Sequence, residues 1–204
     1  MATKTGTGNT GQTNGLRKEN LLEKFFLDQL KDMYYAEQQL LKALNEMKSA
    51  CTTEELEDAF ENHHSQTQKQ IKRLDKVFQL LKEKPEGKKC EAMDGLIKEA
   101  KTIINETKEG TMTRDAALII AAQKVEHYEI ATYGGLVQLA ITLGRNRAAS
   151  LLDKTLQEEE DTDRLLTDIA ESYINFQAEE EDEKTERSEK GERSMESSMT
   201  NSYN

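Results

Sequence analysis

The sequence predicts an all-α fold: a four-helix bundle of two antiparallel helical hairpins joined by a long crossover that contains a short helix. Three observations lead to this fold class. The 204 residues include a single proline, Pro85, so long uninterrupted helices are allowed. Leu, Ala, Glu, Lys and Gln, all good helix formers, are abundant. Apolar residues recur three and four positions apart through most of the chain, as they do on the buried face of a helix.

The first predicted hairpin spans residues 17–83. Its first helix covers about residues 17–49, with an apolar stripe that includes Leu22, Leu30 and Leu40. Its second helix begins after a cap at Thr52 or Thr53 and ends near residue 83. Pro85 and Gly87 then stop the helix, because proline cannot continue it and glycine favours a turn. A short turn between two long helices predicts that they run antiparallel.

The second predicted hairpin follows a connection of about thirty residues. That connection contains a shorter helix between residues 90 and 109, ended by Gly110. The next long helix runs from a cap at Thr113 to residue 143 and stops at Gly144, and the last covers about residues 146–176. Two antiparallel pairs joined by one long crossover is the connectivity of ferritin-like bundles, whereas a simple up-down bundle needs no crossover.

Polar side chains interrupt each apolar stripe near the middle of its helix. Because residues three or four apart share one helix face, the interruptions point into the core. Antiparallel hairpins place helix midpoints at one height, so the four interruptions are expected to meet in one layer. They are Glu37 in the first helix, His63 with Gln66, Thr67 and Gln70 in the second, Gln123, Glu126 and Glu129 in the third, and Glu159, Thr162 and Asp163 in the fourth.

Burying several carboxylates together is costly, and a pair of bound divalent cations is the simplest compensation. Carboxylates and histidines from facing helices suit two iron or manganese ions. The alternative is a metal-free polar core of protonated or hydrogen-bonded acids. His64 and His127 fall off the stripes, and Glu158 and Glu160 belong to an acidic run that we interpret as solvated. For Tyr34 and Tyr133 we favour a hydrogen bond to a core backbone carbonyl over a contact with the site.

Several segments carry a resemblance to the YciE/YciF family of ferritin-like proteins. They start at Asp32 (DMYYAEQQL), Phe60 (FENH), Cys90 (CEAMDGLIKE), Val125 (VEHYEIATYG) and Leu156 (LQEEEDTD), and the resemblance extends over about residues 21–175. It implies a rubrerythrin-like, usually dimeric helical domain linked to bacterial stress responses.

The resemblance also implies a set of metal ligands. These are Glu37, His63, Glu126, Glu129, Glu159 and Asp163, with Glu99 of the crossover as an acid that could cover the site. In one position the chain departs from the family: Gln66 stands where a His-x-x-Glu pattern has an acid. An amide is a weaker ligand than a carboxylate, so this departure puts dinuclear chemistry in question.

The leading hypothesis is a stress-defence metalloprotein whose reduced dinuclear site reacts with peroxide or oxygen. Glu126 and Glu159 would bridge the two ions. A non-catalytic, dimeric interaction protein with a degenerate site is the alternative, and iron storage ranks lower. Gly134 and Gly135 would either allow close approach by another helix or relieve crowding inside the bundle.

Charge and hydropathy argue against two further classes of protein, those that bind nucleic acid and those that span a membrane. The net charge of −11 argues against binding nucleic acid, and no apolar run is long enough to predict a membrane span. Without a secretory signal pattern, and with Cys51 and Cys90 interpreted as reduced thiols, the prediction is a cytoplasmic protein. Residues 1–16 are expected to be disordered, residues 17–177 to form the bundle, and residues 178–204 to form an acidic disordered tail.

Overall fold

The computed structural model describes residues 20–181, and every regular element among them is helical. The long helices are α1 (Leu21–Ala50), α2 (Glu54–Leu81), α4 (Met112–Thr142) and α5 (Asn146–Ile169), and α3 (Glu91–Glu106) is shorter. A π-helical turn, η1 (Ala170–Ile174), leads from α5 into α6 (Asn175–Glu180). The predicted all-α class is therefore confirmed.

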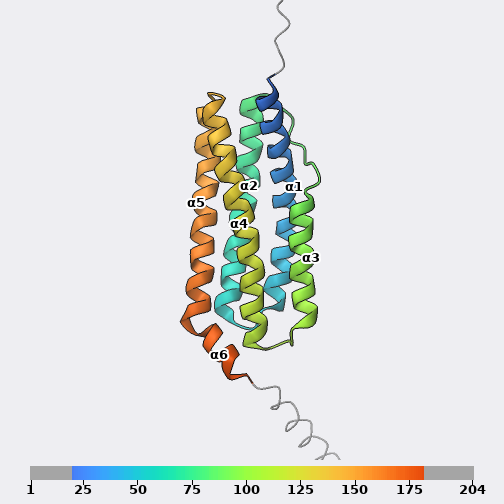
Figure 1. Cartoon of the computed structure of the whole chain (residues 1–204), viewed down its shortest axis with the longest axis vertical. Helices are drawn as coiled ribbons and strands as arrows, with labels where there is room; N and C mark the ends of the chain where they lie inside the picture. The colour runs from blue at the N-terminus through green and yellow to red at the C-terminus, as the bar shows by residue number, and fades with distance from the viewer. Residues whose placement is uncertain (1–19, 182–204) are drawn as a thin grey trace, which may run out of the picture.

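The helices are arranged as two antiparallel hairpins, α1–α2 and α4–α5, which pack against each other. Helix α3 lies outside this group of four, alongside α1 and against α4 (Figure 1). The chain between α2 and α4 is thus a long crossover carrying its own helix, which confirms the predicted connectivity.

The starts of α2 and α4 differ from the predictions in how they are capped. Thr53 holds the N-cap position of α2, but its side chain does not cap the helix. Instead, the Asp115 carboxylate of α4 accepts hydrogen bonds from the Thr52 and Thr53 backbone N–H groups, at 2.7 and 2.9 Å. The cap of α4 is Thr111 rather than the predicted Thr113, because the Thr111 hydroxyl accepts the Arg114 N–H.

The end of the bundle also differs from the prediction. Helix α6 continues to Glu180, three residues beyond the predicted boundary at residue 177. The Glu181 carboxylate accepts backbone N–H groups of Met112 and Thr113, so the chain end is tied to the start of α4. The predictions for residues 1–16 and for the rest of the acidic tail fall on residues 1–19 and 182–204, outside the described residues.

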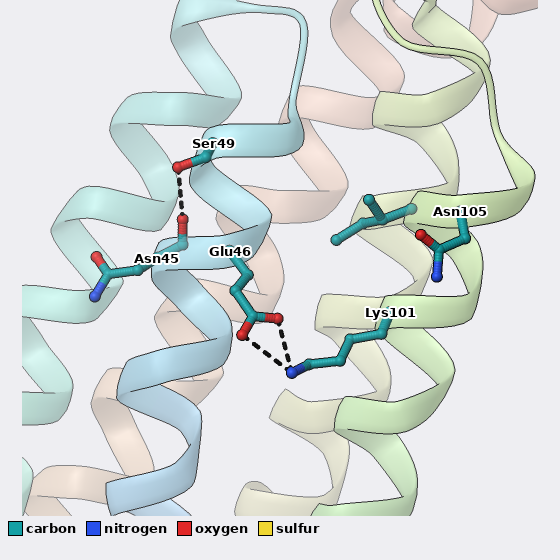
Figure 2. A pocket seen from close by; sticks show the side chains of 6 residues that line it. Asn45, Glu46, Ser49, Lys101 and Asn105 are labelled. Atoms are coloured by element: carbon teal, nitrogen blue, oxygen red, sulfur yellow. Dashed lines mark hydrogen bonds and ion pairs between the residues drawn. The ribbon is translucent and has the colours of Figure 1, made fainter.

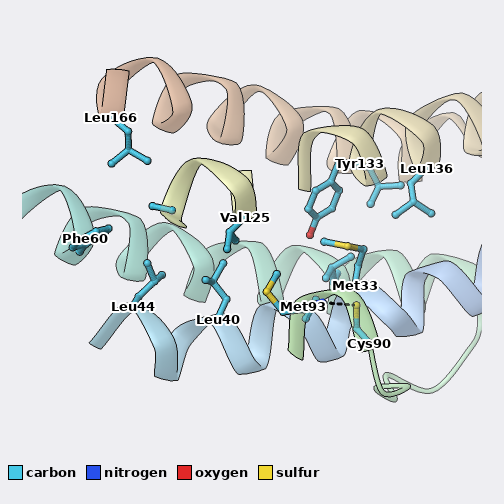
Figure 3. Close-up of a cluster of buried hydrophobic side chains, with 14 of the residues drawn as sticks. Met33, Leu40, Leu44, Phe60, Cys90, Met93, Val125, Tyr133, Leu136 and Leu166 are labelled. Carbon is cyan, nitrogen blue, oxygen red and sulfur yellow. Dashed lines mark hydrogen bonds between the residues drawn. The ribbon is translucent and has the colours of Figure 1, made fainter. Parts of the chain in front are cut away.

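Apolar side chains from all five longer helices fill the core (Figure 3). Met33 and Leu40 of α1, Met93 of α3 and Leu136 of α4 are each at most 2% exposed. This burial drives assembly, since each large apolar side chain removed from water contributes roughly 1.5–3 kcal/mol. Between residues 20 and 181 no helix combines the length and the hydropathy needed to cross a membrane.

Gly134 and Gly135 lie on the side of α4 that faces away from the core. Among the described residues, a Cβ atom added at either glycine would meet no atom within 4 Å apart from its chain neighbours and the backbone of its own helix. Of the two predicted roles, relief of crowding inside the bundle is therefore wrong, and room for an approaching helix stays a prediction.

Candidate metal centre

Each of the four bundle helices contributes acidic or imidazole side chains to one buried layer. Glu37 comes from α1, His63 from α2, Glu126 and Glu129 from α4, and Glu159 from α5. All five are at most 3% exposed. They lie at helix positions flanked by core residues, such as Met33 and Leu40 around Glu37, so the apolar packing that forms the bundle also forces them inward.

Four of these side chains converge closely. One ligand atom from each of His63, Glu126, Glu129 and Glu159 can be chosen so that all four lie within 4.8 Å of one another. The His63 Nε2 atom lies 3.2 Å from Glu126 Oε1, and Nδ1 lies 4.0 Å from Glu159 Oε2. Glu37 stands beside them, close enough for its charge to act on His63 and Glu129. We call these five residues the buried cluster.

Two neutral side chains donate hydrogen bonds to carboxylates of the buried cluster. The Tyr133 hydroxyl donates a short hydrogen bond to Glu37 Oε1, and Figure 3 shows this tyrosine pointing from α4 into the core. The Gln70 amide nitrogen donates to Glu159 Oε1 at 2.5 Å. Each donor fixes one oxygen of its carboxylate and leaves the second oxygen available.

Most of the remaining polar atoms of the buried cluster, and one atom of Gln70 beside it, have no hydrogen-bond partner among the described residues. A buried polar atom that lacks a partner costs about 1–3 kcal/mol, and more when it is charged. Such atoms are rare in folded proteins, and a concentration of them indicates a missing ligand or ion. Among the described side chains they are Glu37 Oε2, His63 Nδ1 and Nε2, Gln70 Oε1, Glu126 Oε2, both oxygens of Glu129, and Glu159 Oε2.

Burial and mutual repulsion raise the pKa values of three carboxyl groups in the cluster. Burial raises the pKa of Glu37 to about 7, although the Tyr133 hydroxyl and His63 oppose the shift. Burial and the charges of Glu37 and Glu126 hold the pKa of Glu129 well above its usual range, and burial with Glu129 does the same for the pKa of Glu159. Burial alone lowers the pKa of His63, but attraction to Glu126 outweighs it and raises the pKa overall. The free cluster therefore binds protons, and cations would replace them.

Two residues of the predicted ligand set, Asp163 and Glu99, lie apart from the buried cluster. Asp163 is partly exposed, and its carboxylate lies 3.3 Å from His127 Nε2 and from the Gln123 amide. Glu99 pairs with Lys124 on the surface. Gln66 lies at the edge of the cluster: it is half-buried, accepts a hydrogen bond from the Thr162 hydroxyl at 3.4 Å, and helps to raise the pKa of His63.

Other polar residues near the cluster were not predicted as metal ligands, although Gln70 was expected in the same polar layer. Gln70 lies seven positions after His63, two helical turns away on the same face, so its spacing was an available signal. Glu158 was predicted to be solvated, but it is half-buried and paired with Arg73, while Glu160 is exposed as expected. Tyr133 donates to Glu37 rather than to a backbone carbonyl, and Tyr34 donates to Asp75. The favoured backbone carbonyl partner is therefore wrong for both tyrosines, whereas the alternative, a contact with the site, is confirmed for Tyr133.

A separate pocket of about 500 Å³ lies on the surface between α1 and α3. Figure 2 shows the Glu46–Lys101 ion pair across it, flanked by Asn45 and Asn105. No residue that lines it belongs to the buried cluster. It is an outer groove between the crossover helix and the bundle.

Comparison with known proteins identifies the family to which this chain belongs. A family model described as a domain of unknown function (DUF892) matches residues 21–179. The chain belongs to this family. The match extends across nearly all described residues, including every helix that contributes to the buried cluster.

Individual relatives agree with that assignment. Protein YciF of Escherichia coli (strain K12) is 48% identical over 159 residues, covering 78% of this chain and 95% of the relative. The crystal structure of the E. coli stress protein YciF matches with a TM-score of 0.73 at 47% identity, covering 78% of this chain and 99% of that one. The predicted resemblance to YciF is thus confirmed.

Two further solved structures show the same fold. YcfI of Rhodopseudomonas palustris, described as a proposed structural protein, matches with a TM-score of 0.71 at 43% identity, covering 74% of this chain and 96% of that one. A protein of Xanthomonas campestris matches with a TM-score of 0.58 at 23% identity, covering 75% of this chain and 93% of that one. The last similarity concerns the fold alone.

Proposed function

We propose that the chain is a ferritin-like metalloprotein of bacterial stress defence whose buried cluster holds two divalent ions, iron or manganese. The proposal rests on the carboxylate and imidazole atoms that are buried at the centre of the bundle without hydrogen-bond partners among the described residues. Without cations these atoms destabilise the fold, and with cations they become ligands. The relative YciF is named a stress protein, which supports the stress assignment.

Charge balance favours two ions over one. The cluster contains four glutamates and one histidine, so its fully ionised carboxylates with a neutral imidazole carry four negative charges. Two divalent cations neutralise that charge completely. A single divalent cation would leave two negative charges in a site with almost no access to water, which is costly unless two protons are retained.

The protein's own residues would give the site its selectivity and shape. Glu37, His63, Glu126, Glu129 and Glu159 would hold the ions, and oxygen with imidazole donors suits iron and manganese. Tyr133 and Gln70 orient Glu37 and Glu159 through the hydrogen bonds described above. Bound iron or manganese supplies electron exchange with a small oxidant such as peroxide or oxygen. The surrounding apolar side chains exclude bulk water from that chemistry.

Metal content tests the proposal directly. Protein stripped of metal and reloaded anaerobically with Fe(II) or Mn(II), then desalted, is expected to hold about two ions per chain by elemental analysis. Glu126→Gln removes a central ligand charge and should lower this content clearly, whereas the matched change Glu160→Gln, on an exposed glutamate of α5, should not. The proposal fails if the unaltered chain retains no ions after loading.

The second candidate function is a non-catalytic, dimeric interaction protein, which would agree with the description of YcfI as a proposed structural protein. The outward Gly134 and Gly135 favour it, because two glycines inside a helix destabilise it by about 1 kcal/mol each and no contact among residues 20–181 requires them. A second copy packing a helix against this face would explain them. Such a protein would dimerise whether or not metal is present.

A further inference from the structure

The contact between α2 and α5 is unusually polar at the height of the buried cluster. Its side chains are Gln66, Gln70 and Arg73 of α2, and Thr155, Glu158 and Thr162 of α5. Four of the six are at most 9% exposed, whereas Gln66 is half-buried and the Glu158 side chain is 21% exposed. We call these six residues the α2–α5 seam. It is a line of polar atoms between the buried cluster and the surface.

Gln70 connects an inner carboxylate to an outer one across this seam. Its amide nitrogen lies 2.5 Å from Glu159 Oε1 and 3.3 Å from Glu158 Oε2. Its carbonyl oxygen is buried and has no hydrogen-bond partner among the described residues. The Gln70 amide thus lies between the outer and the inner carboxylate, so a cation moving inward from Glu158 would pass this side chain before it reached Glu159.

Arg73 pairs with the outer carboxylate, Glu158. Its two terminal nitrogens each lie 2.9 Å from one oxygen of Glu158, and one of them also donates to the Thr155 hydroxyl at 2.6 Å. This bidentate pair has no net charge. It covers the oxygens that a metal ion would use, so the guanidinium and an incoming cation compete for one carboxylate.

We infer that divalent ions reach the buried cluster through the α2–α5 seam, with Glu158 as the first ligand and Arg73 as the opposing charge that keeps the passage closed. The inference rests on the proposed function, because it presumes that the cluster binds metal. It adds an outer metal-binding position, Glu158, to the five residues of the cluster. The ion displaces the guanidinium from Glu158 and then passes the Gln70 side chain to reach Glu159.

Opposite charge changes separate this role from simple structural support. Glu158→Gln leaves Arg73 unpaired, so the passage becomes positive and repels cations. Arg73→Gln leaves Glu158 unpaired, so the passage becomes negative and attracts them. Local fields of this kind change association rates by roughly tenfold or more. Both variants break the same ion pair, so a merely structural effect would move both rates in the same direction.

The experiment times the uptake of Mn(II) by metal-free protein from the loss of the free-ion electron paramagnetic resonance signal, with final content measured by equilibrium dialysis. Uptake is expected to be about tenfold slower in Glu158→Gln and several-fold faster in Arg73→Gln, with final content near two ions per chain in both. Arg73→Lys, which keeps the charge, and Glu160→Gln, on the exposed side of α5, should resemble the unaltered chain.

The outcomes distinguish the two proposals. Uptake by the unaltered chain with equal rates in both seam variants, or with both rates shifted the same way, overturns the passage and leaves the metal centre standing. Loss of final content in Glu158→Gln at an unchanged uptake rate also overturns it, because Glu158 would then belong to the final site. Absence of any uptake by the unaltered chain overturns both proposals.

Discussion

The metal-free protein is expected to lose stability as the pH rises from 5 to 8. Glu37 has a pKa of about 7 in the folded state against 4.5 for an unperturbed glutamate. Across that window the folded state keeps a proton that the unfolded state has released, so the free energy of unfolding falls with rising pH. Each pKa unit corresponds to about 1.4 kcal/mol, and Glu37 alone therefore contributes a loss of about 2.5 kcal/mol between pH 5 and pH 8.

The other cluster residues act in the same direction. The raised pKa values of Glu129 and Glu159 mean that these acids are also protonated when folded and ionised when unfolded. His63, whose pKa is raised above 6.5, contributes stability at low pH that is lost as the pH rises through its folded pKa. The loss from Glu37 is thus a lower limit for the whole cluster.

Urea titrations of metal-stripped protein, at one fixed protein concentration and at several pH values, measure this fall in the free energy of unfolding. Unfolding is followed by circular dichroism. Glu37→Gln keeps an acceptor for the Tyr133 hydroxyl but removes the titrating group, so the loss should shrink by about 2.5 kcal/mol and stability at pH 8 should rise. Glu160→Gln, on an exposed residue, should leave the profile unchanged. With Mn(II) bound the loss should disappear, since cations replace the protons. A metal-free free energy of unfolding that stays level or rises from pH 5 to 8 would refute the electrostatic account.

Three other changes test the structural contacts. Tyr133→Phe removes the only hydrogen bond to Glu37 that the described residues provide, and should lower the free energy of unfolding by about 1–2 kcal/mol at pH 6, read by urea titration. Asp115→Ala leaves two N–H groups and the hydroxyl at the start of α2 without their acceptor, and should cost about 2–3 kcal/mol; a cost below 0.5 kcal/mol would contradict the capping role. Gly135→Ala should stabilise an isolated chain by up to about 1 kcal/mol, because its Cβ meets nothing. If a second copy packs on α4 there, the same change should instead weaken the dimer in analytical ultracentrifugation.

Helical periodicity alone was enough to predict the architecture and most of the cluster. Glu37, His63, Glu126 and Glu159 interrupt apolar stripes, and a residue on such a stripe is carried into the core by its neighbours whatever its own polarity. The short turns and the long crossover then fixed which helices are antiparallel, and hence the common height of the interruptions. These properties are local and repeat along one helix, so they can be deduced from one sequence.

Contacts between helices could not be deduced in this way. Asp163 lies one turn beyond Glu159, about 40° around the helix, and that rotation was enough to turn its carboxylate toward His127 at the surface. Glu158 belongs to an acidic run that predicts exposure to solvent, yet its carboxylate forms an ion pair with Arg73 of another helix. Partners such as Gln70 for Glu159, or Asp115 for Thr53, are separated by 89 and 62 positions. The sequence by itself determined which faces are buried, whereas the rotation of each helix about its axis decided which polar atoms meet, because that angle is set by the packing of all the helices together.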